Sequence, residues 1–185
     1  MSELNVLSKT KLITGDELFA MGDIGPYELI DGEMRPMTPP GGEHGRVEIR
    51  IGRYLDAYVE THQLGWVIGG EVGLYTRRNP DRVRGVDVAF ISHQRLPDGL
   101  PKGYLEAAPE LIVEIISPND RWSEMQAKIE EYFQIGVEQV WVVEPERCTV
   151  LVYRSSLEVE KFQEADVLKG EGALEGFTLA VTKIF

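Results

Sequence analysis

Two acidic residues lie in the middle of otherwise apolar segments of the chain. Asp87 is in the segment RGVDVAFIS, and Glu114 is in ELIVEIIS. A carboxylate buried in such surroundings costs several kcal/mol unless it takes up a proton or gains a basic partner or a cation. Two converging carboxylates repel each other unless a cation lies between them. Hard oxygen ligands suit Mg²⁺ or Mn²⁺ better than zinc, so we predict a divalent-metal site at Asp87 and Glu114.

A lysine downstream of the two acids is the predicted third member of this site. At 100° per residue, Lys128 lies beside Tyr132 at the edge of the apolar stripe of a predicted helix. Arg121 shares this face of the helix. The alternative interpretation is a pair of structural salt bridges, in which Arg84 or Lys128 neutralises the acids.

Three further residues are weaker candidates for the same site. Glu71, in GGEVGL, is either a third carboxylate ligand or a surface acid of a hairpin. His44, in GGEHG, either binds phosphate or caps a helix, and the structural role is the preferred one. Arg121 is the first residue of the predicted helix that carries Lys128. The segment before it, Ser117 to Asp120, is expected to turn the chain and to cap that helix through Asn119 or Asp120.

The elements that position these residues follow from periodicity and turn signals. Apolar residues recur every four positions from Glu43 to His62, which predicts a helix with one buried stripe. A second such helix is predicted from Arg121 to Ile135, ending at Gly136, and a short one from Leu12 to Met21. Asp31-Gly32 predicts a hairpin turn. β-Branched and aromatic residues predict strands over residues 66–76, 83–92, 109–117, 139–144 and 148–154, and a last strand within 173–185.

Strict alternation of side chains fixes the faces of the strand that carries Asp87. Asp87 and Ala89 are expected on one face, and Val86 and Val88 on the other. The next strand, a helix and the strand QVWVVE form a β-α-β unit, so these two strands should be parallel. The prediction is an α/β fold in one domain over residues 1–185, with a mixed sheet flanked by helices in the order helix, three strands, helix, strand.

Composition narrows the function. No apolar run is long enough to span a membrane, and no secretory signal is recognised, so a cytoplasmic location is expected. The single cysteine, Cys148, excludes an internal disulfide and a cysteine-rich zinc site. The net charge of −12 counts against tight binding of duplex DNA by the monomer. A local basic cleft remains possible, because four arginines cluster in TRRNPDRVRG: Arg77, Arg78, Arg82 and Arg84.

These residues together resemble a known family. The run PELIVEIISPNDRW, the later YFQIGVEQVWVVEPERCTVLVYR, the preceding VRGVDVAFIS, the upstream YELIDGEMRPMTPPGGEHG and the final LEGFTLAVTKIF are similar to the Uma-two restriction endonuclease family. That family belongs to the PD-(D/E)XK nuclease-like superfamily. The resemblance implies a restriction-endonuclease-like core, in which Asp87 matches the motif aspartate and Glu114 the (D/E). Two positions depart from the motif: Val86 replaces a proline, and Ile116 stands where the lysine belongs. Lys128 matches a lysine that has migrated to the next helix.

The resulting hypothesis is a Mg²⁺-dependent (or Mn²⁺-dependent) endonuclease that hydrolyses phosphodiester bonds in DNA. Asp87 and Glu114 would hold the metal, and Lys128 would complete the catalytic set. A homodimer is expected, because an enzyme of this size that cuts both strands gains from pairing. The alternative is a non-catalytic dimeric interaction module that retains the nuclease fold, since a fold by itself does not establish activity.

Overall fold

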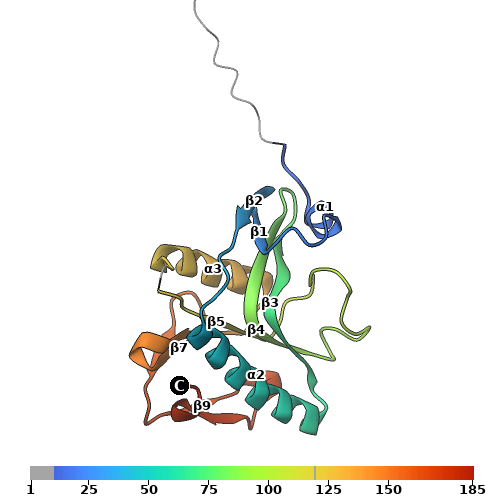
Figure 1. Ribbon diagram of the computed structural model, residues 1–185. Coiled ribbons are helices and arrows are strands. Elements are labelled where there is room, and N and C mark those ends of the chain that lie inside the picture. The colour runs from blue at the N-terminus through green and yellow to red at the C-terminus, as the bar shows by residue number, and fades with distance from the viewer. Residues whose placement is uncertain (1–10, 119) are drawn as a thin grey trace, which may run out of the picture.

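One large mixed sheet forms the centre of the structure, a computed structural model that describes residues 11–118 and 120–185. Helix α2 packs on one face of this sheet and helix α3 on the other (Figure 1). The helices are α1 (Gly15–Ala20), α2 (Gly42–His62) and α3 (Trp122–Ile135). The strands are β1 (Tyr27–Ile30), β2 (Glu33–Pro36), β3 (Gly65–Arg77), β4 (Arg82–Ser92), β5 (Leu111–Ile115), β6 (Gln139–Glu144), β7 (Thr149–Tyr153), β8 (Val159–Phe162), β9 (Val167–Lys169) and β10 (Thr178–Ala180).

Strand β4 is the centre of the sheet. It pairs with β3 along its length, with β5 at Val88 to Phe90 and with β1 at Val83, always antiparallel. Strand β6 pairs parallel to β5, and β7 and β8 follow antiparallel. The order α2, β3, β4, β5, α3, β6 confirms the predicted mixed α/β architecture, including the parallel pair on either side of α3.

Helix α2 buries the stripe that its periodicity predicts, whereas α3 buries only the middle of its predicted stripe and leaves Trp122 43% exposed. On α2, Val47, Ile51, Leu55 and Val59 are buried against the sheet. On α3, the buried apolar residues are Met125 and Ile129, followed by Tyr132. Both helices stop at a residue in the left-handed conformation, Gln63 for α2 and the predicted Gly136 for α3.

The start of α3 differs from the prediction. Its N-cap residue is Arg121, and no side chain caps it. The Asp120 carboxylate instead accepts a hydrogen bond from the Ser117 N–H at 2.8 Å, which closes the preceding turn. Asn119, the other predicted cap, lies outside the described residues. The predicted capping by Asp120 is therefore wrong, because its carboxylate accepts from the Ser117 N–H and not from an N–H of the first turn of α3.

A β-bulge in β3 lies directly opposite Asp87. The β3–β4 register passes from Gly69–Val88 to Val72–Val86, so Gly70 and Glu71 face the single residue Asp87. The bulge interrupts the alternation of faces predicted for β4. Val88 packs with the α2 cluster, but Val86 packs with the α3 cluster beside Ala89. The prediction that Val86 and Val88 share a face is therefore wrong at the bulge.

The N-terminal hairpin lies against the start of β4. A capping box at Thr14 starts α1, which is shorter than the predicted helix over Leu12 to Met21. The predicted Asp31-Gly32 turn joins β1 and β2, with positive φ at both residues. Because β1 pairs with β4, this hairpin delivers Glu28 to the strand that carries Asp87.

The C-terminal region contains more strands than the sequence predicts. β8 extends the large sheet, and β9 pairs with β10 in a small second sheet packed on the α2 side. Only β10 falls within the predicted last strand. Among residues 11–118 and 120–185, no helix is long and apolar enough to cross a membrane.

Candidate active site

Asp87 is the most unusual of the predicted site residues. It lies in β4 and is 6% exposed. Its Oδ2 atom accepts a hydrogen bond from the Ile115 N–H at 2.6 Å, and its Oδ1 atom lies 3.2 Å from the His44 Nε2 atom. No lysine or arginine nitrogen of the described residues lies within 4.0 Å of it. Asp87 is therefore a buried carboxylate without a fixed cationic partner, apart from a histidine that is charged only when protonated.

Glu114 lies beside Asp87 on the neighbouring strand. In the antiparallel β4–β5 pair, Val88 is opposite Val113. The next positions along the two strands are Asp87 and Glu114, so the two acids lie opposite each other. Glu114 is 3% exposed. The Tyr132 hydroxyl donates to its Oε1 atom at 2.6 Å, and the Lys128 ammonium donates to its Oε2 atom at 3.1 Å. Burial outweighs the opposing charge of Lys128 and raises the pKa of Glu114 to about 7.

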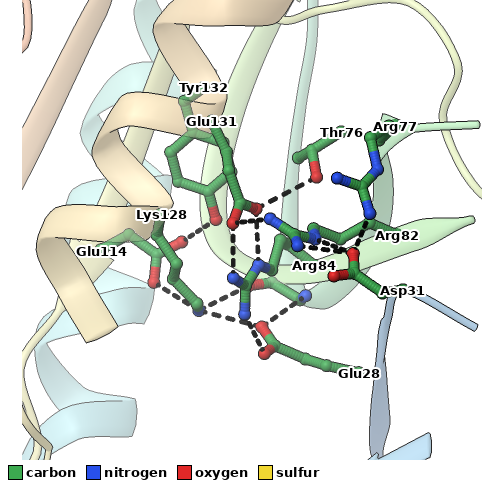
Figure 2. A network of polar contacts seen from close by, with 11 residues as sticks. Glu28, Asp31, Thr76, Arg77, Arg82, Arg84, Glu114, Lys128, Glu131 and Tyr132 are labelled. Carbon is green, nitrogen blue, oxygen red and sulfur yellow. Dashed lines mark hydrogen bonds and ion pairs between the residues drawn. The ribbon is translucent and has the colours of Figure 1, made fainter. Parts of the chain in front are cut away.

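Lys128 reaches from α3 into the same region (Figure 2). Besides Glu114, its Nζ atom contacts Glu28 Oε1 at 3.1 Å and the Gly85 carbonyl at 3.3 Å. Burial favours the neutral amine, but the carboxylates of Glu114 and Glu28 more than offset it, so the pKa of Lys128 is raised. The side chain is therefore a buried ammonium whose three N–H groups face three protein acceptors.

The charge network in Figure 2 contains an acid that the sequence reasoning missed. Glu28, from β1, contacts Lys128 with Oε1 and accepts from Arg84 with Oε2 at 2.9 Å. It also accepts from the Gly85 N–H at 3.2 Å. Glu28 stands beside Tyr27, Leu29 and Ile30. This is the same signal, an acid among apolar strand residues, that identified Asp87.

Two of the weaker candidates lie near Asp87. The bulge places Glu71 opposite it, and burial, then the Asp87 charge, raise the pKa of Glu71. His44 is buried at the start of α2, with Nε2 near Asp87 and Nδ1 3.3 Å from the Ser117 Oγ atom. Burial lowers the pKa of His44, but its contact with Asp87 outweighs this, so the pKa is raised. The preferred capping role of His44 is wrong, because Gly41 is the N-cap of α2 and no side chain caps it.

A neighbouring acid on α2 was also missed. Glu48 follows His44 by one helical turn, and its Oε1 atom accepts from the Gly70 N–H in the bulge at 2.7 Å.

Arg121, by contrast, does not lie at the site. Its side chain is 80% exposed, and the acid found near it is Glu124 at 4.0 Å.

The comparison with known families identifies the family of the chain. The family Uma2, described as "Putative restriction endonuclease", matches residues 16–182. The chain belongs to the Uma2 family. One solved structure similar to it is that of "a putative nuclease belonging to DUF820" from Anabaena variabilis ATCC 29413. The two chains are 21% identical with a TM-score of 0.80, and the match covers 94% of this chain and 97% of the other. That similarity shows a shared fold. No curated protein matches the chain significantly.

The arginine cluster of this Uma2 chain is not an open basic cleft. All four arginines form ion pairs with acids from other parts of the fold. The pairs are Arg77 with Asp31; Arg78 with Asp16, Asp81 and Glu106; Arg82 with Asp31 and Glu131; and Arg84 with Glu28 and Glu131. Glu131 accepts from Arg82, from Arg84 and from the Thr76 hydroxyl. The local basic cleft that the sequence left open is therefore neutralised, because carboxylates from α1, the β1–β2 hairpin, α3 and the neighbouring loops pair with these arginines.

The salt-bridge alternative for the two acids applies to one of them. Lys128 does pair with Glu114, as that alternative expects. Arg84 pairs with Glu28 and Glu131 and leaves Asp87 without a basic partner.

Within residues 11–118 and 120–185, no three His, Cys, Asp or Glu side chains are grouped closely enough to hold a metal ion by themselves. Any ion at Asp87 and Glu114 would thus draw part of its coordination from water or from a bound substrate.

Proposed function

We propose that this Uma2 chain is a metal-dependent endonuclease that hydrolyses phosphodiester bonds in DNA. The observation that carries the proposal is the buried carboxylate of Asp87, which has no lysine or arginine within 4.0 Å among the described residues and lies next to Glu114. A buried anion of this kind is expected to acquire a cation. The family description and the nuclease-like structural relative make nucleic acid the expected substrate.

The donor set suits Mg²⁺ or Mn²⁺. Asp87 and Glu114 offer carboxylate oxygens, and Mg²⁺ is commonly bound by one or two carboxylates together with waters and substrate phosphates. Two acids without a third ligand therefore fit this ion better than they fit zinc or calcium. When bound, the metal would polarise the scissile phosphate and lower the pKa of a water molecule.

The remaining side chains have positioning and electrostatic roles in this proposal. The Lys128 ammonium stabilises negative charge that develops on the phosphate. Since its N–H groups already face Glu114, Glu28 and the Gly85 carbonyl, a phosphate oxygen must replace one of them. The Gly85 carbonyl, at 3.3 Å, is the longest of the three contacts and the first we expect to be exchanged. Tyr132 orients Glu114 through its hydroxyl.

A second candidate function is a non-catalytic dimeric interaction module with the nuclease fold. The net charge of −12 and the presence of Ile116 in place of the motif lysine favour it. The closed network around Lys128 favours it as well, because every polar group there already has a protein partner. This candidate predicts a folded dimer that cleaves no nucleic acid.

A cleavage assay separates the two candidates. Single- and double-stranded DNA and RNA are incubated with the wild-type chain in Mg²⁺ or Mn²⁺, beside Asp87→Ala and Lys128→Ala. Glu130→Gln, a change at an exposed residue of α3, is the matched control. The proposal expects DNA cleavage by wild type and control, with a loss of about 100- to 1,000-fold in both site variants. Cleavage that persists in the site variants would reveal a contaminant and contradict the proposal, and no cleavage by any chain would favour the module.

The oligomeric state is part of the proposal. A cut through both strands needs two sites, and a homodimer supplies them. Sedimentation velocity with and without a DNA duplex tests this: a monomer in both conditions, together with double-strand cleavage, would contradict the dimer.

A further inference from the structure

The arginines of the chain fall into two groups. Nine of the twelve have a carboxylate of the described residues within 4.0 Å. The other three, Arg46, Arg50 and Arg53, have no Asp or Glu carboxylate within 4.0 Å among residues 11–118 and 120–185, and all three lie on α2. Arg50 is nevertheless held in place, because its guanidinium donates to the main-chain oxygens of Ile184 and Phe185. In a chain with a net charge of −12, two exposed arginines without a carboxylate partner in the described part of the chain, Arg46 and Arg53 on one helix, call for a physical explanation.

Arg46 and Arg53 lie on one line along the outer side of α2. Positions 46 and 53 fall within about 20° of each other on a helical wheel and lie away from the buried stripe of Val47 and Ile51. Lys183 extends this line, because its ammonium lies 5.5 Å from the centre of the Tyr54 ring, which also contacts the Arg53 guanidinium at 4.7 Å. We call Arg46, Arg53 and Lys183 the α2 stripe.

The partner of such a surface is a polyanion. We propose that the α2 stripe binds the phosphate backbone of the DNA on which the proposed endonuclease acts. This inference rests on the proposed function and assigns DNA contact to residues other than the neutralised arginines of β3 and β4. From residue 46 to residue 53 the helix rises about 10 Å, which matches about three phosphates along one strand at 3.4 Å per step.

The stripe connects to the candidate site at the start of α2. His44, which contacts Asp87 from the inner side of the helix, is only two residues from Arg46. Around it, a Cβ atom at Gly41, Gly42 or Gly45 would meet nothing within 4 Å, and none of the three has a positive φ. Neither packing nor backbone conformation requires glycine there. Small residues in an open position allow close approach of another backbone, which is the room that a strand needs to pass from the stripe to Asp87.

The test is the salt dependence of DNA binding. Fluorescence anisotropy of a labelled DNA duplex is measured at several NaCl concentrations with the Asp87→Asn chain, in which cleavage is not expected to interfere. The same chain with Arg46→Gln and Arg53→Gln is compared with one that carries Arg121→Gln and Arg147→Gln, two exposed arginines outside the stripe. The stripe predicts weaker binding and a slope of log K against log salt that is smaller by about two for the first pair, and little change for the second.

Three results would overturn this inference. They are an unchanged slope and affinity in the Arg46→Gln, Arg53→Gln chain, an equal loss in the control pair, or no duplex binding by the parent chain at any salt concentration. The proposed function is judged separately, by cleavage with wild-type residues at the stripe. DNA cleavage combined with stripe-independent binding would reject the stripe and leave the endonuclease in place.

Discussion

The Lys128 ammonium lies 3.1 Å from the Glu114 carboxylate, although fourteen residues separate them and one is on a helix while the other is on a strand. The turn after β5 and the direction of α3 bring the two together in the buried interior. There the lysine acts as a fixed cation for Glu114, while Asp87, on the next strand, has none. This asymmetry between two adjacent acids underlies the predictions that follow.

The first prediction concerns pH and the metal-free protein. Because the pKa of Glu114 is raised from 4.5 to about 7, the folded chain binds a proton that the unfolded chain releases. The stability that Glu114 contributes is complete below pH 4.5 and is lost as the pH rises through about 7. Mg²⁺ binds the ionised carboxylate, so the rise in Tm on adding Mg²⁺ should be larger at pH 8 than at pH 5.5. Glu114→Gln should remove this pH dependence; a Tm shift that is equal at both pH values in wild type would contradict it.

The second prediction concerns the hydroxyl group of Tyr132. This group donates to Glu114 at 2.6 Å and lowers the pKa of that acid, so Tyr132→Phe should move the pH midpoint of Mg²⁺ binding upward. The loss of a hydrogen bond to a charged group should also cost about 1.5–3 kcal/mol in the free energy of unfolding at pH 8. Isothermal titration across pH and urea unfolding measure the two effects. A midpoint that stays at its wild-type pH would show that Tyr132 serves packing alone.

The third prediction separates structure from catalysis within the charge network. Glu131→Gln should destabilise the chain by about 3 kcal/mol, because the part-buried guanidinium groups of Arg82 and Arg84 lose the carboxylate that they share. Glu130→Gln, at the exposed neighbouring position, should change stability by no more than about 0.5 kcal/mol. Urea unfolding at pH 7 gives both values.

A pH series extends the test of Glu131. Burial alone would raise its pKa, but Arg84 and Arg82 more than offset this, so its pKa is lowered. Its contribution is then present above pH 4.5 and lost as the pH falls below the lowered pKa. The difference between Glu131→Gln and wild type should therefore shrink in acid. A difference that is constant across the pH range would contradict the ion-pair explanation.

The acids of the candidate site could be recognised in the sequence where the surrounding apolar run was long. Asp87 and Glu114 stand in apolar runs, and a charge in such a run requires a partner. Glu28 carries the same signal in a four-residue strand, too short for its burial to be evident. Tyr132 was counted in the apolar stripe of α3, because periodicity reports that a side chain is buried but not that its hydroxyl has found an acceptor.

The arginines were misjudged for a different reason. Arg82 and Arg84 are close in sequence to Arg77 and Arg78, which predicts a basic surface. Their carboxylate partners, such as Glu28 and Glu131, are 47 or more residues away and become neighbours only through the tertiary fold. Local charge density therefore could not reveal the neutralisation.

For the fold as well, the elements with a clear sequence pattern were predicted and those without one were missed. The helices follow from the periodicity of apolar residues, and the parallel β5–β6 pair follows from the crossover connection of a β-α-β unit. Strand β8 was missed because three of its four residues are exposed and it has no apolar alternation to detect. The bulge at Gly70 and Glu71 was missed as well, since a two-residue irregularity leaves the composition of the strand unchanged.

The most direct test of the central claim is a titration of the metal-free protein with Mn²⁺, followed by the loss of the electron paramagnetic resonance signal of the free ion. Wild type and the Glu130→Gln control are compared with Asp87→Asn, with circular dichroism to verify that each chain is folded. We predict that wild type and control bind Mn²⁺ and that Asp87→Asn loses this binding. Equal binding by a folded Asp87→Asn chain would contradict a metal site at Asp87 and Glu114.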